Sequence, residues 1–203
     1  MKPRRKTAFA ALTKPSRFPA SQEVEGWDTA RLLAEGSEFE QYRFVGCDFG
    51  DANLSRFLFA DCLFERCNLS SAQLSNAGLQ NVAFAECKLL GVQFSACRDM
   101  LFGVHFDHCN LGYTSFAGKK MPGTRFAHCS LPEADFTNAD LSEAVFAHCS
   151  LANATFHDTQ LTGADFSTAG AFTIDPEANQ LLRARFALSG LPGLLAKYGL
   201  IVE

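Results

Sequence analysis

Residues 134–166 read ADFTNADLSEAVFAHCSLANATFHDTQLTGADF, and every fifth position from Phe136 onward is Phe or Leu. The residue two places before each of these centres is small, being Ala, Cys or Thr. Apolar residues at alternate positions suit a short extended segment better than a helix, because alternate side chains of an extended chain share one face. Five residues cannot form a stable sheet alone, so the pattern predicts that each segment stacks on copies of itself.

The five-residue period covers most of the chain. It runs from Phe39 to Phe94, slips by two residues, and resumes at Leu101 to reach Phe166, which gives 26 centres. Residue types also recur every 20 residues, with one interval of 22 across the slip. We expect one such series to form a core ladder: Phe44, Phe64, Phe84, Phe106, Phe126, Phe146 and Phe166.

Twenty residues per coil make four sides of five residues. The sequence therefore predicts an all-β fold, a right-handed quadrilateral parallel β-helix, with its handedness set by the crossover rule for parallel strands. The slip near residues 95–100 contains Arg98 and Asp99, and we expect it to be an outward bulge and a candidate recognition loop.

The remaining segments divide the chain by composition. Residues 1–22 are basic and contain three prolines, which predicts a flexible tail, and residues 23–36 are expected to cap the N-terminal end. The β-helix is assigned to 37–168 and a last irregular coil to 169–190. Residues 191–203 are expected to form a short helix, 191–198, and a terminal strand, 200–202, because Pro192 suits a first turn and Gly199 a helix end.

Length and charge exclude several classes of protein. The 203 residues are 47% apolar and 20% charged, with a net charge of −4, which favours a folded domain over a basic nucleic-acid binder. No apolar run approaches the roughly 20 residues of a membrane helix, and the run 8–12 is shorter than the core of a signal peptide. We therefore expect a cytoplasmic protein without a membrane partner.

Cysteine and histidine follow the repeat. All eight Cys fall at inward positions, where Cys serves as a small apolar residue, so no disulfide framework is predicted. His108, His128 and His148 are 20 residues apart and should stack along one corner. Either they form a solvated stripe or they hold a metal ion. We expect no metal, because the neighbouring Cys residues face the core and the histidines face outward.

No catalytic constellation is present in the sequence. It lacks a Gly-rich phosphate loop, a nucleophile elbow and a zinc-ligand spacing, and flat repeat faces provide no concave pocket. We therefore expect a protein that binds a partner and has neither catalytic residues nor a cofactor.

Negative charge is concentrated late in the repeats. Between residues 126 and 182 there are eight acidic residues and no Lys or Arg. Two readings stay open: a partner-binding surface, or a charged surface that keeps the rod soluble. Six acidic residues are the candidates for partner binding: Glu133, Asp135, Asp140, Glu143, Asp158 and Asp165.

The units 134–136, 139–141 and 164–166 resemble the Ala-Asp/Asn-Leu unit of the pentapeptide-repeat family, and the tail resembles those of its microcin-immunity and albicidin- and quinolone-resistance members. The resemblance implies a homodimer, joined at its C-terminal segment, that binds DNA gyrase or another type II topoisomerase by imitating DNA, and protects it from a toxin. It implies these dimer contacts, which could instead cap one monomer: Leu194, Leu195, Tyr198, Leu200 and Ile201. The alternative function is a scaffold that binds an unrelated protein through its flat faces.

Overall fold

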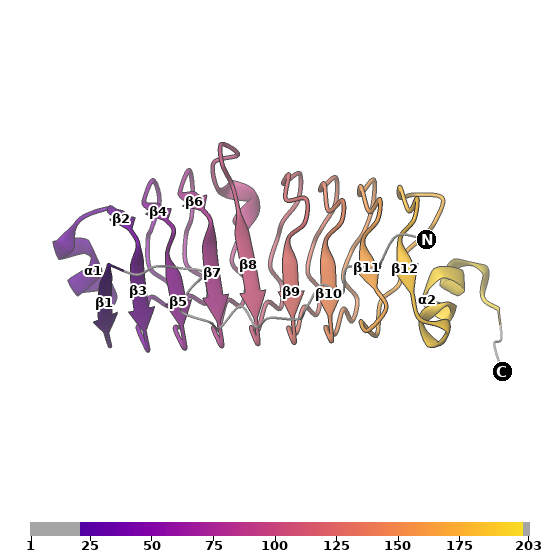
Figure 1. Cartoon of the computed structure of the whole chain (residues 1–203), viewed down its shortest axis with the longest axis horizontal. Coiled ribbons are helices and arrows are strands. Elements are labelled where there is room, and N and C mark those ends of the chain that lie inside the picture. Colours follow the sequence, from indigo (N-terminus) through magenta and orange to yellow (C-terminus); the bar gives the residue numbers. More distant parts are fainter. Residues whose placement is uncertain (1–20, 201–203) are drawn as a thin grey trace, which may run out of the picture.

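The computed structural model describes residues 21–200, which form a rod wound from parallel strands (Figure 1). The rod is a right-handed quadrilateral β-helix of about eight turns, followed by a short C-terminal helix, and this confirms the predicted fold class. The predicted terminal strand is not confirmed: Leu200 has no strand structure, and residues 201–203 lie outside the described residues.

The longest sheet runs along one side of the rod, which we call side 1. It has nine strands, and each pairs in parallel with the next coil. Its strands are, in spatial order, β1 (Gln22–Glu25), β3 (Tyr42–Val45), β5 (Leu63–Glu65), β7 (Val82–Ala85), β8 (Val104–Asp107), β9 (Arg125–Ala127), β10 (Val145–Ala147), β11 (Asp165–Phe166) and β12 (Arg185–Phe186).

From side 1 the chain passes sides 2, 3 and 4 before it returns. On side 4 the first coils form a three-stranded parallel sheet of β2 (Glu38–Glu40), β4 (Leu58–Ala60) and β6 (Gly78–Gln80). Elsewhere the coils are joined by single bridges, such as Ser115 with Asp135 on side 3 and Lys120 with Asp140 on side 4.

The interior is filled by columns of phenylalanine. On side 1, Phe44 pairs with Phe64 twenty residues later, whereas Phe84 pairs with Phe106 across the slip. The seven rings of this series are at most 2% exposed, and successive centroids lie 4.7–5.4 Å apart. A second column on side 3 meets the first edge to face: Phe94, Phe116, Phe136 and Phe156. Burial of these rings supplies the main driving force for winding the chain.

The structure corrects the register that we predicted at the slip. Leu101, expected to be an inward centre, is 71% exposed, and Phe102 is buried in its place. Arg98 is still in register, because its N–H donates to the carbonyl of Ala77, and pairing resumes where Val104 meets Val82. The intervening residues contain the two-residue insertion and project beyond the other coils between β7 and β8 (Figure 1). We call residues 97–103 the slip loop; it follows the short 3-10 helix η2 (Phe94–Ala96).

The N-terminal cap is itself a coil of the solenoid. Strand β1 pairs with β3, so that Val24 lies against Phe44, and the coil begins at Gln22 within the segment expected to be a tail. Helix α1 (Thr29–Glu35) follows, begun by Asp28, whose side chain accepts a hydrogen bond from the N–H of Arg31. Leu32 of this helix is fully buried in the core. Residues 1–20 of the expected tail lie outside the described residues.

The C-terminal end is closed by short helices. The predicted helix 191–198 consists of α2 (Pro192–Leu195) and the 3-10 helix η4 (Ala196–Tyr198), preceded by the 3-10 helix η3 (Leu188–Gly190). Helix α2 packs closely over Phe172, since a Cβ on Gly193 would lie 2.2 Å from the Phe172 carbonyl oxygen. Gly199 ends the segment in the left-handed conformation, with φ of 62°.

Candidate partner-binding surface

The six candidate acidic residues encircle the rod. We call Glu133, Asp135, Asp140, Glu143, Asp158 and Asp165 the acidic band. Asp135 lies on side 3, Asp140 on side 4 and Asp165 on side 1. The exposed residues Glu133, Glu143 and Asp158 occupy corners, where φ is left-handed at 56°, 59° and 51°. The structure therefore does not bring them together on one face.

Three of these carboxylates also shape the backbone. In each, Oδ1 accepts a hydrogen bond from the N–H two residues later: Asp135 from Thr137, Asp140 from Ser142 and Asp165 from Ser167, at 2.9–3.0 Å. Asn53 and Asn68 accept the same bond in earlier coils, so either amide or carboxylate oxygen can perform this turn-forming role. The charge of the three aspartates is thus separable from their structural function.

Part of the late acidic charge is paired with cations. Asp165 lies 3.8 Å from the guanidinium of Arg185. Lys197 lies 2.7 Å from Asp175 and 2.6 Å from Glu177, and its hydrogen bonds lower the pKa of both carboxyls. These two ion pairs hold the C-terminal segment against the last coil.

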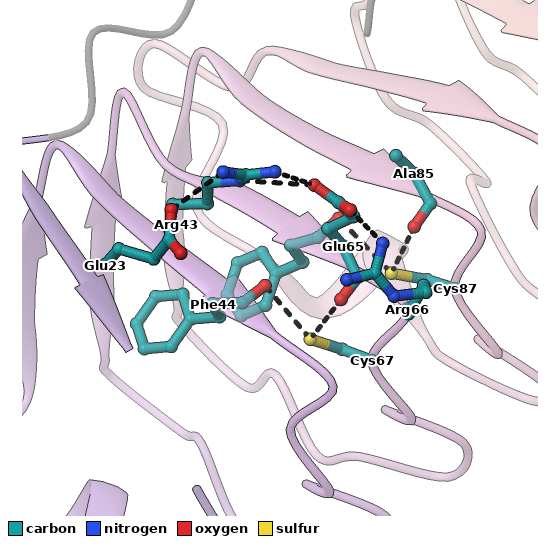
Figure 2. Close-up of polar contacts among 9 residues, drawn as sticks. Glu23, Arg43, Phe44, Glu65, Arg66, Cys67, Ala85 and Cys87 are labelled. Carbon is teal, nitrogen blue, oxygen red and sulfur yellow. Dashed lines mark hydrogen bonds and ion pairs between the residues drawn. The ribbon is translucent and has the colours of Figure 1, made fainter. Parts of the chain in front are cut away.

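Two arginines of the first coils are paired as well. Figure 2 shows Arg43 between Glu23 and Glu65, with Arg66 against the same glutamate. The nitrogen-to-oxygen distances from Arg43 are 2.7 Å to Glu23 and 2.5 Å to Glu65, and the bond to Glu65 raises the pKa of Arg43. The charges thus alternate along β1, β3 and β5, which neutralises much of this part of side 1.

The slip loop presents one basic and one acidic side chain, followed by two apolar side chains. Arg98 is exposed, and Asp99 is 82% exposed with Oδ1 placed 2.7 Å from Nζ of Lys119. Met100 and Leu101, at 72% and 71%, are among the most exposed apolar side chains between residues 21 and 200. We did not predict that Lys119 contacts the loop. The sequence did carry a signal of an unusual contact, because this lysine stands at an inward position that is normally filled by a small residue.

The three histidines stack along the corner between sides 1 and 2. Ring centroids are 4.5 Å apart for His108 and His128, and 4.9 Å apart for His128 and His148. All three are exposed, and Nδ1 of His108 lies 2.8 Å from the carboxylate of Asp107. Within residues 21–200 no three His, Cys, Asp or Glu side chains are placed to hold a metal ion.

All eight cysteines are buried and free. Several thiols donate to a main-chain carbonyl of the preceding coil; Figure 2 shows Cys67 and its bond to Phe44, at 3.3 Å. Burial raises the pKa of Cys62 to about 11 and that of Cys97 to about 12. The inward orientation predicted from the repeat is therefore confirmed.

The expected dimer contacts divide into two groups. Leu194 is partly buried against the core, as a cap would be. Leu195, Tyr198 and Leu200 are 37%, 53% and 60% exposed, and the Tyr198 hydroxyl donates to Glu177. Ile201 lies outside the described residues.

Among the helices of residues 21–200, none has the length and apolar character to cross a bilayer.

Comparison with known proteins gives related repeats and related rods. A family model described as a pentapeptide repeat region matches residues 37–99 and 92–166. The quinolone resistance pentapeptide repeat protein QnrB96 of Scandinavium goeteborgense is 26% identical over 96 residues, which is 40% of this chain and 45% of that protein. The match thus spans less than half the length of this relative.

Solved structures show the same architecture. Two trypsin-treated variants of QnrB1, a plasmid-mediated fluoroquinolone resistance protein, superpose with a TM-score of 0.60 at 16% identity. Each alignment covers 91% of this chain, and 96% or 97% of the other. Because the family model matches more than half of the residues, with the geometry that its repeat requires, the chain belongs to the pentapeptide repeat family.

Proposed function

We propose that this protein binds a type II topoisomerase such as DNA gyrase and protects it from a toxin or antibiotic, by binding alone and without catalysis. The observation that carries the proposal is its sequence similarity to a quinolone resistance protein, over repeats that form the same kind of rod. The gyrase is cytoplasmic, and so is the site of action that we propose.

The acidic band supports imitation of DNA by its position along the rod. Successive coils rise by about 4.8 Å, so the six carboxylates between residues 133 and 165 place several negative charges within a short length of the rod, as phosphates do along a duplex. A basic groove that normally holds DNA would gain the same counterion release from these carboxylates. Binding should therefore weaken as salt is raised.

The geometry of the band also constrains the partner. Glu133 and Glu143 are ten residues apart, half of a 20-residue coil, and lie at two different corners. Asp165 continues the band onto side 1 of the next coil. A flat partner could meet only a fraction of these charges, whereas a concave saddle could meet most of them. The slip loop ends 30 residues before Glu133, which is six coil sides earlier, and provides a second contact of different chemistry.

The test is quinolone-inhibited DNA supercoiling by purified gyrase, titrated with this protein at two salt concentrations. Substitution of Asp135, Asp140 and Asp165 by Asn removes three charges and keeps an oxygen for each turn hydrogen bond. We expect this triple variant to require at least about tenfold more protein for the same protection. Reversal to Lys would be a poorer test, because it also removes the turn bonds.

The matched control is the triple variant Asp48→Asn, Asp51→Asn and Asp61→Asn, which removes the same charge from the early coils. If the control variant protects gyrase as well as the wild-type protein does, the result supports the acidic band as the binding surface. Equal loss in both variants would mean that only net charge matters. No protection by the wild-type protein at micromolar concentration would remove the proposed function and leave the scaffold alternative.

We also propose that the active form is a dimer joined at the C-terminal segment. The exposed apolar side chains of this end are concentrated in the last 20 described residues: Leu182, Leu188, Leu191, Leu195, Tyr198 and Leu200. So many exposed apolar side chains within 20 residues are uncommon on a surface that stays in water. The contact of two such ends would double the length of the rod.

Light scattering on the full chain tests the dimer. Leu188→Glu combined with Leu195→Glu should give a monomer, because each carboxylate would be buried in the joint surface. Leu33→Glu on α1, at a side chain 53% exposed at the opposite end, is the control and should leave the dimer intact. A wild-type monomer at micromolar concentration would contradict the proposal.

A further inference from the structure

Lys119 is a buried cation in a position that most coils fill with a small side chain. Its equivalents in the next coils are Ala139, Thr159 and Asn179, and its own side chain is 3% exposed. Burial of an ammonium group is costly unless polar partners surround it. The partners of Lys119 therefore indicate why the residue is there.

The Lys119 ammonium contacts three residues of the slip loop. Nζ donates to the carbonyl oxygen of Cys97 at 2.5 Å and to Oδ1 of Asp99 at 2.7 Å. It also lies 5.3 Å from the centroid of the Phe102 ring, within the range of a cation–π contact. One side chain thus holds the beginning, the outward turn and the inward return of the same loop.

The bond to Cys97 takes the place of a main-chain bond. In the coils before and after, the carbonyl at this position accepts from the N–H of the residue 21 places later, as Ala77 does from Arg98 and Lys119 from Asp140, both at 2.8 Å. The two-residue insertion breaks this pairing at Cys97. The carbonyl is buried, so it would be left without a partner if Lys119 did not donate to it.

We propose that Lys119 is the positioning residue of the slip loop, whose buried ammonium holds the loop in one conformation and so presents Met100 and Leu101 to the partner. The presentation to a partner rests on the proposed function, whereas the holding of the loop does not. The main-chain bonds of the loop to the preceding coil, from Arg98 to Ala77 and from Gly103 to Leu79, lie at its two ends. The clamp acts between them.

The experiment compares Lys119→Met with Lys120→Met in the full chain. Both remove one lysine charge near the loop, but the Lys120 side chain is exposed, and the main chain of Lys120 pairs with Asp140. Amide hydrogen exchange is followed in peptides covering 98–103 and in peptides covering 126–166. We expect exchange in 98–103 to rise by about tenfold or more in Lys119→Met, as for loss of a buried hydrogen bond, and to be unchanged in Lys120→Met.

Asp99→Ala provides a second variant that should fold, because its side chain is 82% exposed. It removes one of the two hydrogen bonds, so we expect an intermediate rise in loop exchange. Unchanged exchange in both Lys119→Met and Asp99→Ala would overturn the clamp. Equal rises in 98–103 and 126–166 would also overturn it, because they would mean general destabilisation.

A gyrase-protection assay distinguishes the holding of the loop by Lys119 from the presentation of Met100 and Leu101 to the partner. If wild-type protein protects, Lys119→Met should protect at least about tenfold less well, and Lys120→Met as well as wild type. A loosened loop with full protection would overturn the presentation to a partner. If wild-type protein does not protect, the proposed function fails, and the exchange result alone decides whether Lys119 holds the loop.

Discussion

The regular coils and the coil that contains the slip loop both fill the core and pair their main-chain groups, but they do so with different contacts. Between residues 104 and 166 each coil repeats the previous one, so that Phe126 meets Phe106 on one side and Phe146 on the other. Main-chain groups pair at constant intervals, and the side chains on the outside can vary without effect on the core. Stability in this region comes from repetition.

In the coil that contains the slip loop, the insertion shifts the register, and a side chain supplies a hydrogen bond that the main chain supplies in the regular coils. The carbonyl of Cys97 accepts a hydrogen bond from Nζ of Lys119, and Phe102 takes the inward place that the period assigns to Leu101. The comparison teaches that a solenoid tolerates an insertion when one residue of the next coil supplies the missing hydrogen bond. It also shows where the fold can carry a specific surface, because Met100 and Leu101 become free to face outward.

The largest expected effect is on the stability of the regular coils. Phe126→Ala should lower the free energy of unfolding by about 3–5 kcal/mol, because the ring is fully buried between two stacked neighbours. Phe102→Ala removes the same atoms from the slip loop and should cost less than about 3 kcal/mol, because fewer rings surround it. Urea denaturation followed by circular dichroism measures both. Equal losses would remove the distinction between the two regions.

Thiol reactivity should sharpen the comparison. Burial raises the pKa of both Cys62 and Cys97, so both should react slowly with iodoacetamide at pH 8. Cys97 begins the slip loop and is 6% exposed, whereas Cys62 is 0% exposed in a regular coil. We expect Cys97 to be labelled at least about tenfold faster, through local opening. Peptide mass spectrometry measures the rates, with labelling in denaturant as the reference, and equal rates would contradict the prediction.

Acid should loosen the slip loop before the regular coils, and this is the smallest expected effect. The hydrogen bond from Lys119 lowers the pKa of Asp99 below its ordinary value. The stabilisation is therefore complete above the ordinary carboxyl pKa and is lost as the pH falls through the lowered one, below about pH 4. Amide exchange of 98–103, corrected for the intrinsic rate, should rise there, and Asp99→Asn should show no such transition. Simultaneous loosening of 126–166 would argue against a local clamp.

The sequence predicted the repeat well because the repeat is local. Each five-residue unit carries its own inward and outward positions, so the four sides, the 20-residue coil and the Phe series follow from spacing alone. Spacing could not predict the first coil, since residues 22–36 lack the pattern and join the solenoid through main-chain pairing of β1 with β3. Nor could it show that Lys197 neutralises Asp175 and Glu177, because those contacts join segments 20 or more residues apart.

By itself, the amino-acid sequence determined a four-sided rod with cysteines and phenylalanines inside and acidic residues outside, because alternation within five residues leaves each side chain one orientation. Only the tertiary structure decided how the irregular coil closes, which of Leu101 and Phe102 enters the core, and how the acidic band is distributed around the circumference. The physical reason is that these outcomes depend on hydrogen bonds between neighbouring coils, where a main-chain donor missing from one coil must be replaced by a side chain from the next.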